Sequence, residues 1–597
     1  MPTQAPNDKI QPIVQVQVAT PKENDVAPPA VALNGKRFSY RQQQGSGRPT
    51  LTEPQHRYKP GRLDIWMLGL TIVIGGQYFS WNAGISAGLY TFLFCFTLIG
   101  SAYVVLCCCT SEITGALPFA GGAYGLARCT LGFYPAFLIG CCEALEYMMY
   151  VSTSVISLAD MIVQIQPDLN RFRPLLWALF FVTALFFHLK SERVFWVFNL
   201  VIGSVSLGIV LLFCFGSLPY VSFAKYAADA HMDFIGGAHG FMRVLPLACW
   251  FFVGVESLNL ASDQVTQPKQ IIPFAQIACV ATLFVTGTAV FFVTVSLPFK
   301  LADLPTELAP FNNGFQPLFH ISHTNATALS LPATYATAFG FMWCYGKLIA
   351  AMATSRLLPV FLSRVSDRTG APHVAIIVGS LLSYVGCLVV YFAPAISKSL
   401  FSICILAAFM SYTGQCIGYI SLRFHYRNIK SSSFRSPFGI PGAIYSMSVW
   451  LMGIVSIIGF QDNGGTEIIV FASIVAGLSL YYFAWAKKRQ TFSAQENRIL
   501  LVAHVMKFNG RRTAVARKRG NGSGGGNTTS NKTTQNNPRN TTRYTNMENG
   551  NRDDPAASPT KSHSPSKASS KVRGMKTKLH GLVHRSTTKA TTGTTTM

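Results

Sequence analysis

The chain has 597 residues, of which 50% are hydrophobic and only 12% charged, and its mean hydropathy is +0.32. Soluble globular chains carry about twice that share of charge, so the composition excludes an ordinary soluble enzyme and predicts many membrane-spanning helices. The net charge of +25 is concentrated at the two ends, with 22 Lys/Arg against 4 Asp/Glu in residues 487–597. Such a distribution indicates solvated tails, or attraction to an anionic membrane surface, and no nucleic-acid partner.

The charge pattern divides the chain into three parts. Residues 1–62 and 487–597 lack the apolar content of a core, so we expect two disordered cytoplasmic tails. Residues 63–486 carry 18 Lys/Arg against 16 Asp/Glu, and we expect an all-α, polytopic membrane domain there. A span needs roughly 20 apolar residues, and the sequence predicts twelve: 64–84, 87–111, 131–158, 173–190, 194–216, 241–262, 272–297, 332–355, 373–393, 399–422, 443–461 and 466–486.

The first span contains an interruption, IGGQYFSWNAG, at residues 74–84. Gly75 and Gly76 allow the backbone to leave helical angles, and a broken helix is tolerated in a membrane where it lines a cavity or packs against protein. The helix that resumes near Asn82 would offer free N–H groups and a positive dipole end to a polar ligand. The alternative is that the glycines form a helix-packing contact. Three aromatic residues would form walls of such a site and a face for an ammonium group: Tyr78, Phe79 and Trp81.

The third span contains two acidic residues in the stretch CCEALEYMMY. Glu143 and Glu146 are three residues apart and therefore share a helix face. Carboxylates at membrane depth are costly and mark functional sites by default, so we expect either to be kept neutral, to pair with an amine or to exchange a proton. The alternative is a structural role for both. Lys347 in the eighth span is the candidate partner for one of them.

The sixth span has a second interruption, in LACWFFVGVESLNLASD at residues 247–263. Gly254 lies within this span, and Glu256 follows it. The first and sixth spans would begin the two halves of a five-plus-five repeat, and broken helices at matching places in two halves indicate the binding site of a transporter.

The distribution of Lys and Arg predicts the orientation. With the N-terminus inside, eleven of these residues fall in cytoplasmic loops and five in outer loops, which favours cytoplasmic termini. The longest outer loop, 298–331, then carries the sequence NAT at Asn325, a candidate glycosylation site.

The remaining motifs indicate no further chemistry. All 14 cysteines lie between Cys95 and Cys416, mostly in apolar runs and without CxxC spacing, so we expect buried thiols, no metal site and no disulfide framework. We expect no cofactor. The N-terminal region has no early apolar stretch, so the sequence predicts no cleavable signal peptide.

Four stretches together resemble the amino acid–polyamine–organocation superfamily of permeases over residues 63–486. They are GALPFAGGAYGLARCTLGFYPAFLIG after the second span, FFVGVES in the sixth, SDQVTQPKQIIPFAQI in the next loop, and YGKLIAAMATSRLLPVFLSRVSDRTGAPHVA at the end of the eighth. The resemblance implies a leucine-transporter-like fold of ten core helices in two inverted repeats, plus two more. It also implies that the unwound parts of spans 1 and 6 hold the substrate, with contacts at Ile74, Gly75, Gly76, Gln77, Tyr78, Phe252, Gly254 and Glu256.

The chain departs from the common family pattern at one informative place. Most members have Gly-Ser-Gly-Ile-Phe in the first span, whereas this chain has Gly75-Gly76-Gln77-Tyr78-Phe79. With FSWN and EALEY, this looks closest to the ethanolamine-permease branch. The lysine that some proton-coupled members carry in the fifth span is absent, which puts that coupling route in doubt.

The sequence therefore predicts a secondary transporter, not an enzyme, that works by alternating access in a lipid bilayer, with the plasma membrane as the expected location. Amino acids are the first substrate class that the resemblance implies, and ethanolamine-like amines are the second. Glu143 and Glu146 favour a proton as the coupling ion. A nutrient sensor that signals through its tails is the alternative from another class.

Overall fold

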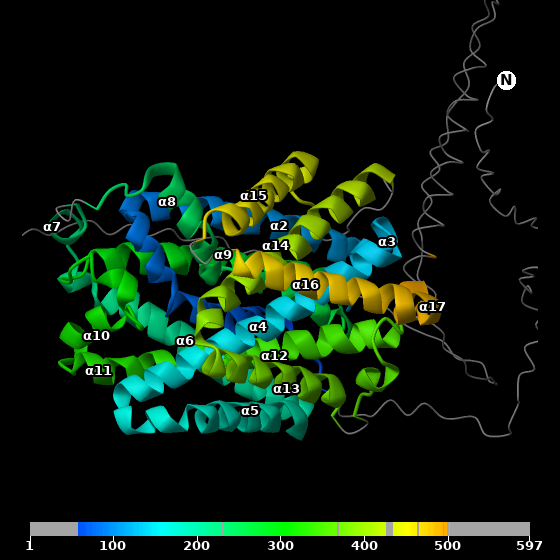
Figure 1. Ribbon diagram of the computed structural model, residues 1–597, viewed down its shortest axis with the longest axis horizontal. Helices are drawn as coiled ribbons and strands as arrows, with labels where there is room; N and C mark the ends of the chain where they lie inside the picture. Colours follow the sequence, from blue (N-terminus) through cyan, green and yellow to red (C-terminus); the bar gives the residue numbers. More distant parts are fainter. Residues whose placement is uncertain are drawn as a thin grey trace, which may run out of the picture. The chain divides into compact units, whose positions relative to one another are not determined.

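The computed structural model describes residues 58–493, apart from 229–231, 367–368, 426–433 and 462–464, together with 495–497 and 501. Most of the two predicted tails therefore lies outside the described residues. The described residues form helices and no strand (Figure 1). The principal helices are α1 (Arg62–Val73), α2 (Leu89–Ala116), α3 (Gly122–Thr130), α4 (Phe133–Ile165), α5 (Arg173–Lys190), α6 (Glu192–Gly216), α8 (Gly237–Val244), α9 (Pro268–Val295), α12 (Leu331–Thr354), α13 (His373–Phe392), α14 (Pro394–His425), α15 (Gly439–Gly459) and α16 (Thr466–Tyr481).

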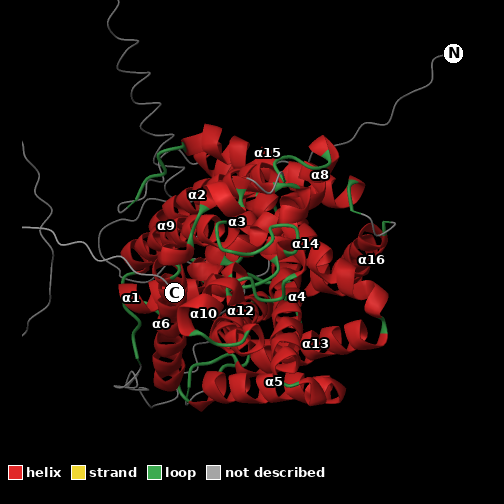
Figure 2. Ribbon diagram, turned by 90° about the vertical axis from the view of Figure 1, so that its left-hand side faces the viewer, coloured by secondary structure: helices red, strands yellow, loops and turns green. Residues whose placement is uncertain are grey.

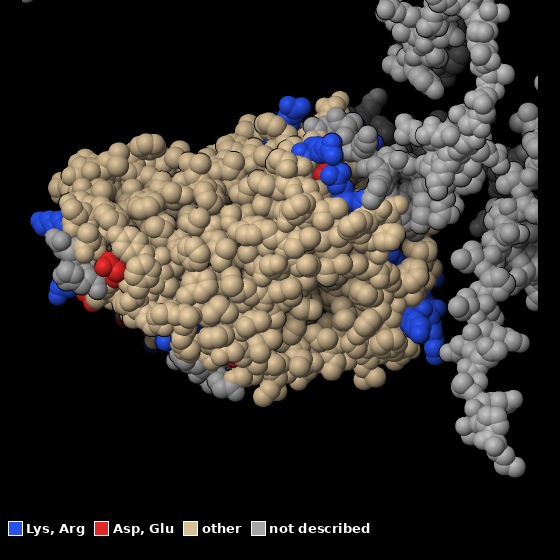
Figure 3. Space-filling view, turned by 90° about the horizontal axis from the view of Figure 1, so that it is seen from above, with Lys and Arg blue, Asp and Glu red and all other residues tan. Residues whose placement is uncertain are grey.

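The predicted membrane spans are confirmed in number. Eleven helices in the described part of the chain are long and apolar enough to cross a membrane, and a twelfth is obtained when the bent pair Arg62–Gln77 and Trp81–Ala87 counts as one span. The face drawn in Figure 3 has a broad band without charged residues, with Lys and Arg mainly towards the two ends. Such a band matches the hydrocarbon layer, which excludes charge.

The spans differ strongly in how deeply they lie in the bundle. The sixth span, Gly237–Asp263, is 94% buried over its most apolar window, whereas the last, Thr466–Arg489, is only 6% buried. In Figure 2 helices α4 and α12 lie in the interior, with α5, α13, α15 and α16 around them. The broken sixth span is thus surrounded by protein, which is the condition under which membrane-embedded backbone can leave the helix.

The bundle has two ends that carry different short elements. The loop after α9 forms α10 (Asn312–Phe319) and α11 (His323–Ala326) at one end, near α7 (Phe223–Tyr226). Helix α3 and the short α17 (Lys487–Arg489) lie at the other end (Figure 1). We call these the α10 end and the α3 end. The predicted orientation assigns the α10 end to the outside, and Asn325 is exposed there.

Candidate functional site

The first span is interrupted where the glycines predict. Helix α1 ends at Val73, a 3₁₀ turn covers Ile74–Gln77, and a second 3₁₀ helix covers Trp81–Ala87. The two parts are bent by 43°, and Ser80 between them has a positive φ of 69°. The backbone of this span therefore leaves the α-helix for about fifteen residues, in the middle of the bundle.

Both glycines of this break are also close-packing positions. A Cβ atom on Gly76 would lie 1.8 Å from the carbonyl oxygen of Trp250, and one on Gly75 would lie 2.3 Å from Thr337 Oγ1. The Gly75 N–H donates to that same hydroxyl over 2.8 Å. The glycines therefore form packing contacts as well as a break. Gly76 brings the first span into backbone contact with the sixth, and Gly75 packs on α12.

The sixth span is interrupted at the matching place. Two 3₁₀ helices, Leu245–Phe251 and Val255–Asp263, flank Gly254, which has a φ of 100° that favours glycine. The carboxylate of Glu256 accepts a hydrogen bond from the Gly254 N–H over 3.1 Å. The carboxylate therefore satisfies one of the backbone groups that the break releases.

Three carboxylates are buried beside these breaks: Glu143, Glu146 and Glu256, each at most 1% exposed. The Tyr147 hydroxyl lies 3.0 Å from Glu143 and 3.4 Å from Glu256, and Glu143 also accepts from the Ala123 N–H over 3.2 Å. The Tyr412 hydroxyl donates to Glu146 over 2.5 Å. Among the described residues, none of the three forms an ion pair with Lys, Arg or His.

Several polar atoms near the glycine contact lack a partner in the described part of the chain: Glu146 Oε2, the Tyr150 hydroxyl and Trp250 Nε1, all buried. Tyr150 lies one helical turn after Glu146 on α4, so both point to one face. The rings of Tyr150 and Trp250 are 5.1 Å apart, and the Tyr150 hydroxyl is 3.0 Å from the Cβ position of Gly76. Because buried polar groups are nearly always paired, this cluster has the chemistry of a site for a polar ligand.

Several residues expected at the site have side chains that face elsewhere. Gln77 Nε2 donates to Leu283 O and Thr286 Oγ1 of α9, over 3.1 and 3.0 Å. The Tyr78 hydroxyl donates to Ser206 O over 2.5 Å. Phe252 packs against Phe96, Tyr103 and Phe284. Ile74 is fully buried in the same core. These side chains hold the broken spans in place.

The expected aromatic walls also differ from the prediction. Trp81 packs among Phe92, Phe251 and Phe291, and Tyr78 packs on Phe311. Phe79 reaches the ring of Trp250. The aromatic residues next to the unpartnered polar atoms are thus Tyr150 and Trp250. The bend in the first span directs that span's own aromatic side chains towards the surrounding helices.

The expected pairing of Lys347 with a glutamate of the third span is wrong. Lys347 Nζ lies 2.7 Å from Asp263 Oδ2, at the end of the sixth span. The side chains of Lys347 and Asp263 are 10% and 34% exposed, whereas the glutamates are fully buried. The pairing removes the only lysine that the sequence offered as a counter-ion for the buried carboxylates.

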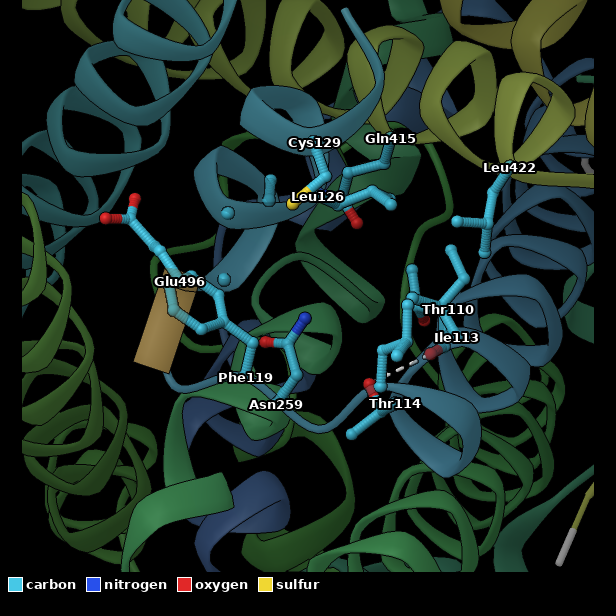
Figure 4. A pocket seen from close by; sticks show the side chains of 14 residues that line it. Thr110, Ile113, Thr114, Phe119, Leu126, Cys129, Asn259, Gln415, Leu422 and Glu496 are labelled. Carbon is cyan, nitrogen blue, oxygen red and sulfur yellow. Dashed lines mark hydrogen bonds between the residues drawn. The ribbon is translucent and has the colours of Figure 1, made fainter. Parts of the chain in front are cut away.

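A cavity lies at the α3 end below the carboxylates, with an empty volume of about 600 Å³ including its open mouth. Its lining includes Thr110, Gly122, Ala123, Asn259 and Gln415, and Figure 4 shows the two amide side chains on opposite sides of it. Ala123, which lines the cavity, also donates its N–H to Glu143, so the cavity lies next to this carboxylate.

Sequence reasoning missed the hydroxyl partners of the carboxylates. Tyr147 follows Glu143 by one helical turn, so the helix period alone could have indicated it. Tyr412 comes from α14, 266 residues from Glu146, and no local pattern points to it. Trp250 lies within the stretch that predicted the second break, but nothing in that stretch indicates that its side chain lies at the site.

Comparison with known proteins agrees with this arrangement. The model of the amino acid permease family matches residues 62–480. An uncharacterized transporter of Rhizobium meliloti is 26% identical over 53% of this chain and 70% of its own length. The lysine-specific permease LysP of Lactococcus lactis is 22% identical over 73% of this chain and 91% of its own. The methylthioribose transporter of Bacillus subtilis is 23% identical over 71% of this chain and 92% of its own length.

Broken helices in the centre of a bundle of eleven or twelve spans, next to buried and unsatisfied polar groups, define an integral membrane transporter. The chain belongs to the amino acid permease family, and its relatives are permeases rather than enzymes.

Proposed function

We propose that this chain is a secondary active transporter that carries amino acids or related small amines by alternating access, with protons as the coupling ion. In this proposal residues 63–486 are the transport domain, both termini are cytoplasmic, and the plasma membrane is the location. The observation that carries the proposal is the group of three buried carboxylates beside the two broken spans, which have no cation partner within the described part of the chain. Ionised carboxylates buried without a counter-ion are strongly disfavoured, so the site needs a cation from outside the chain.

An ammonium group offers what the site lacks. It has three donors and no acceptor, and Glu146 Oε2 and the Tyr150 hydroxyl are free to accept. The rings of Tyr150 and Trp250 would add cation–π attraction. Protons would neutralise the remaining carboxylates, which gives the pair Glu143 and Glu256 the coupling role.

Amino acids are the preferred substrate class over amino alcohols. The side chain of Gln77 is tied to α9, so it does not occupy the space at the first break that a substrate carboxylate would need. The relatives also favour this class, because a lysine permease matches most of the transport domain.

Uptake by purified protein in vesicles tests the proposal. A panel of labelled amino acids and ethanolamine is offered with and without an inward pH gradient. We expect accumulation of at least one amino acid that depends on the gradient, and its loss in Glu146→Gln. Asp303→Asn, an exposed carboxylate at the α10 end, is the matched control. No uptake of any compound by the folded protein would refute the proposal.

A further inference from the structure

The chain directly after the last span folds back onto the α3 end of the bundle. Residues 491–493 and 495–497, here called the C-terminal segment, belong to the part expected to be a disordered tail, yet they are described and make directed contacts. The Thr491 N–H donates to Ser355 O over 3.0 Å, and Arg128 Nη2 donates to Thr491 O over 2.9 Å. The segment is thereby tied to both α3 and the end of α12.

Glu496 is the centre of this attachment. Its side chain is 2% exposed and lies 3.4 Å from Arg128 Nη1, which is equally buried. It accepts from the Ser355 hydroxyl over 2.7 Å and from the Tyr124 hydroxyl over 3.3 Å. The segment's own Ser493 N–H also donates to it over 2.6 Å. The donors around this carboxylate therefore form a specific binding site for Glu496 on the bundle.

Arg128 is held in place by aromatic contacts as well as by the charge of Glu496. Its guanidinium lies 4.9 Å from the ring centre of Phe492 and 5.2 Å from that of Phe133. One aromatic ring comes from the C-terminal segment and the other from the start of α4. The arginine is therefore sandwiched between a fixed element and the segment, and the segment covers it from solvent.

The docked segment also borders the cavity near the carboxylates. Glu496 lines that cavity, opposite Thr110 and Thr114 of α2 (Figure 4). A neighbouring cavity beside Lys347 and Asp263 is lined by Ser493 and Gln495 of the same segment. Both openings at the α3 end are therefore bordered by the C-terminal segment.

We propose that the C-terminal segment is a latch that shuts the α3 end of the transport pathway while Glu496 is docked on Tyr124, Arg128 and Ser355, and that it leaves this site when that end opens. The assignment of this end to a transport pathway rests on the proposed function. The docking itself does not. An autoinhibitory contact of this kind makes the start of the tail a control element for the transporter, because whatever binds or modifies the tail acts on the latch.

The chain contains its own reporter of latch release. Thirteen of the 14 cysteines are buried, whereas Cys129 of α3 is partly exposed and lines the same cavity as Glu496. Burial, together with the negative charge of Glu496, raises the pKa of Cys129 from 9.0 to about 11. Because the thiolate is the reactive form, this rise in pKa leaves about a hundredfold less thiolate at neutral pH.

Maleimide labelling of the purified full-length protein measures the latch without any substrate. We expect Cys129 to react slowly in the wild type and about tenfold faster in Glu496→Gln, with hundredfold as the ceiling. Ser355→Ala should give an intermediate rate. Gln495→Ala, on the exposed neighbour of Glu496, should keep the wild-type rate, and Cys129→Ser identifies the labelled residue.

A chain ended after Gln490 gives the second measurement and guards against a local effect of the substitution. It should label as fast as Glu496→Gln and show a higher initial uptake rate. Equal labelling of wild type, Glu496→Gln and the shortened chain would overturn the latch. Faster labelling in the two altered proteins without any uptake by wild type would keep the latch and refute the proposed function instead.

Discussion

The contact between the two broken spans makes Gly76 the position where one methyl group should do most damage. Its Cβ would lie 1.8 Å from the backbone oxygen of Trp250, whereas ordinary Cβ contacts begin near 3.4 Å. In Gly76→Ala the two backbones must therefore separate by about 1.6 Å, the difference between these distances. Since the obstacle is main chain and not a movable side chain, we expect a cost at or above the upper end of the about 1–3 kcal/mol found for overpacked cores.

Thermal unfolding in detergent, followed by fluorescence-detected size exclusion, measures this cost. Gly208→Ala is the matched control, because nothing lies within 4 Å of its Cβ position on α6 and alanine favours a helix by about 0.8–1.0 kcal/mol over glycine. Gly208→Ala should keep or raise the melting temperature, and Gly76→Ala should lower it by several degrees and abolish uptake. Equal melting temperatures and uptake for the two variants would refute the contact between spans 1 and 6.

Three further predictions concern single positions. At least one of Glu143→Gln and Glu146→Gln should abolish pH-driven uptake or substrate binding; pH-dependent transport of normal rate in both would assign the pair a structural role. Gln77→Gly should leave the ratio of the inhibition constants of serine and ethanolamine unchanged, because the Gln77 side chain is tied to α9. It should lower the free energy of unfolding by about 1–2 kcal/mol, because two hydrogen bonds are lost. A selective gain in serine binding would show that the side chain does reach the substrate. Glycosidase treatment should lower the apparent mass of the wild type on a gel and leave that of Asn325→Gln unchanged. A glycan on the basic C-terminal tail would contradict the predicted orientation.

The breaks were predictable because their causes are local. Paired glycines within an apolar run, and Gly254 followed by Glu256, weaken a helix through their own conformational freedom and polarity, so the sequence carries the signal within a few residues. The number of spans follows in the same way from apolar length. The boundaries are less local: α4 runs to Ile165, beyond the predicted 158, because Asp160 interrupts the apolar run but pairs with Arg173 of α5 and does not end the helix.

The partners within the site were not predictable, because they come from distant spans. Lys347 lies 84 residues from Asp263, and the choice between that carboxylate and a deeper one depends on how α12 is turned. The hydroxyl of Tyr412 meets Glu146 only through the packing of α14 on α4. The composition of residues after 487 indicates disorder, yet Thr491 and Glu496 are both bound by the buried Arg128.

The Tyr147 hydroxyl stands between two carboxylates, 3.0 Å from Glu143 and 3.4 Å from Glu256, but it has a single proton to donate. It can therefore satisfy one of them at a time. Glu256 sits on the broken sixth span and Glu143 on the continuous α4, so a turn of the broken span towards Tyr147 would reverse which of the two distances is shorter. The tyrosine would then donate to Glu256, and Glu143 would keep only the hydrogen bond from the Ala123 N–H, so the demand for a cation would pass from one carboxylate to the other.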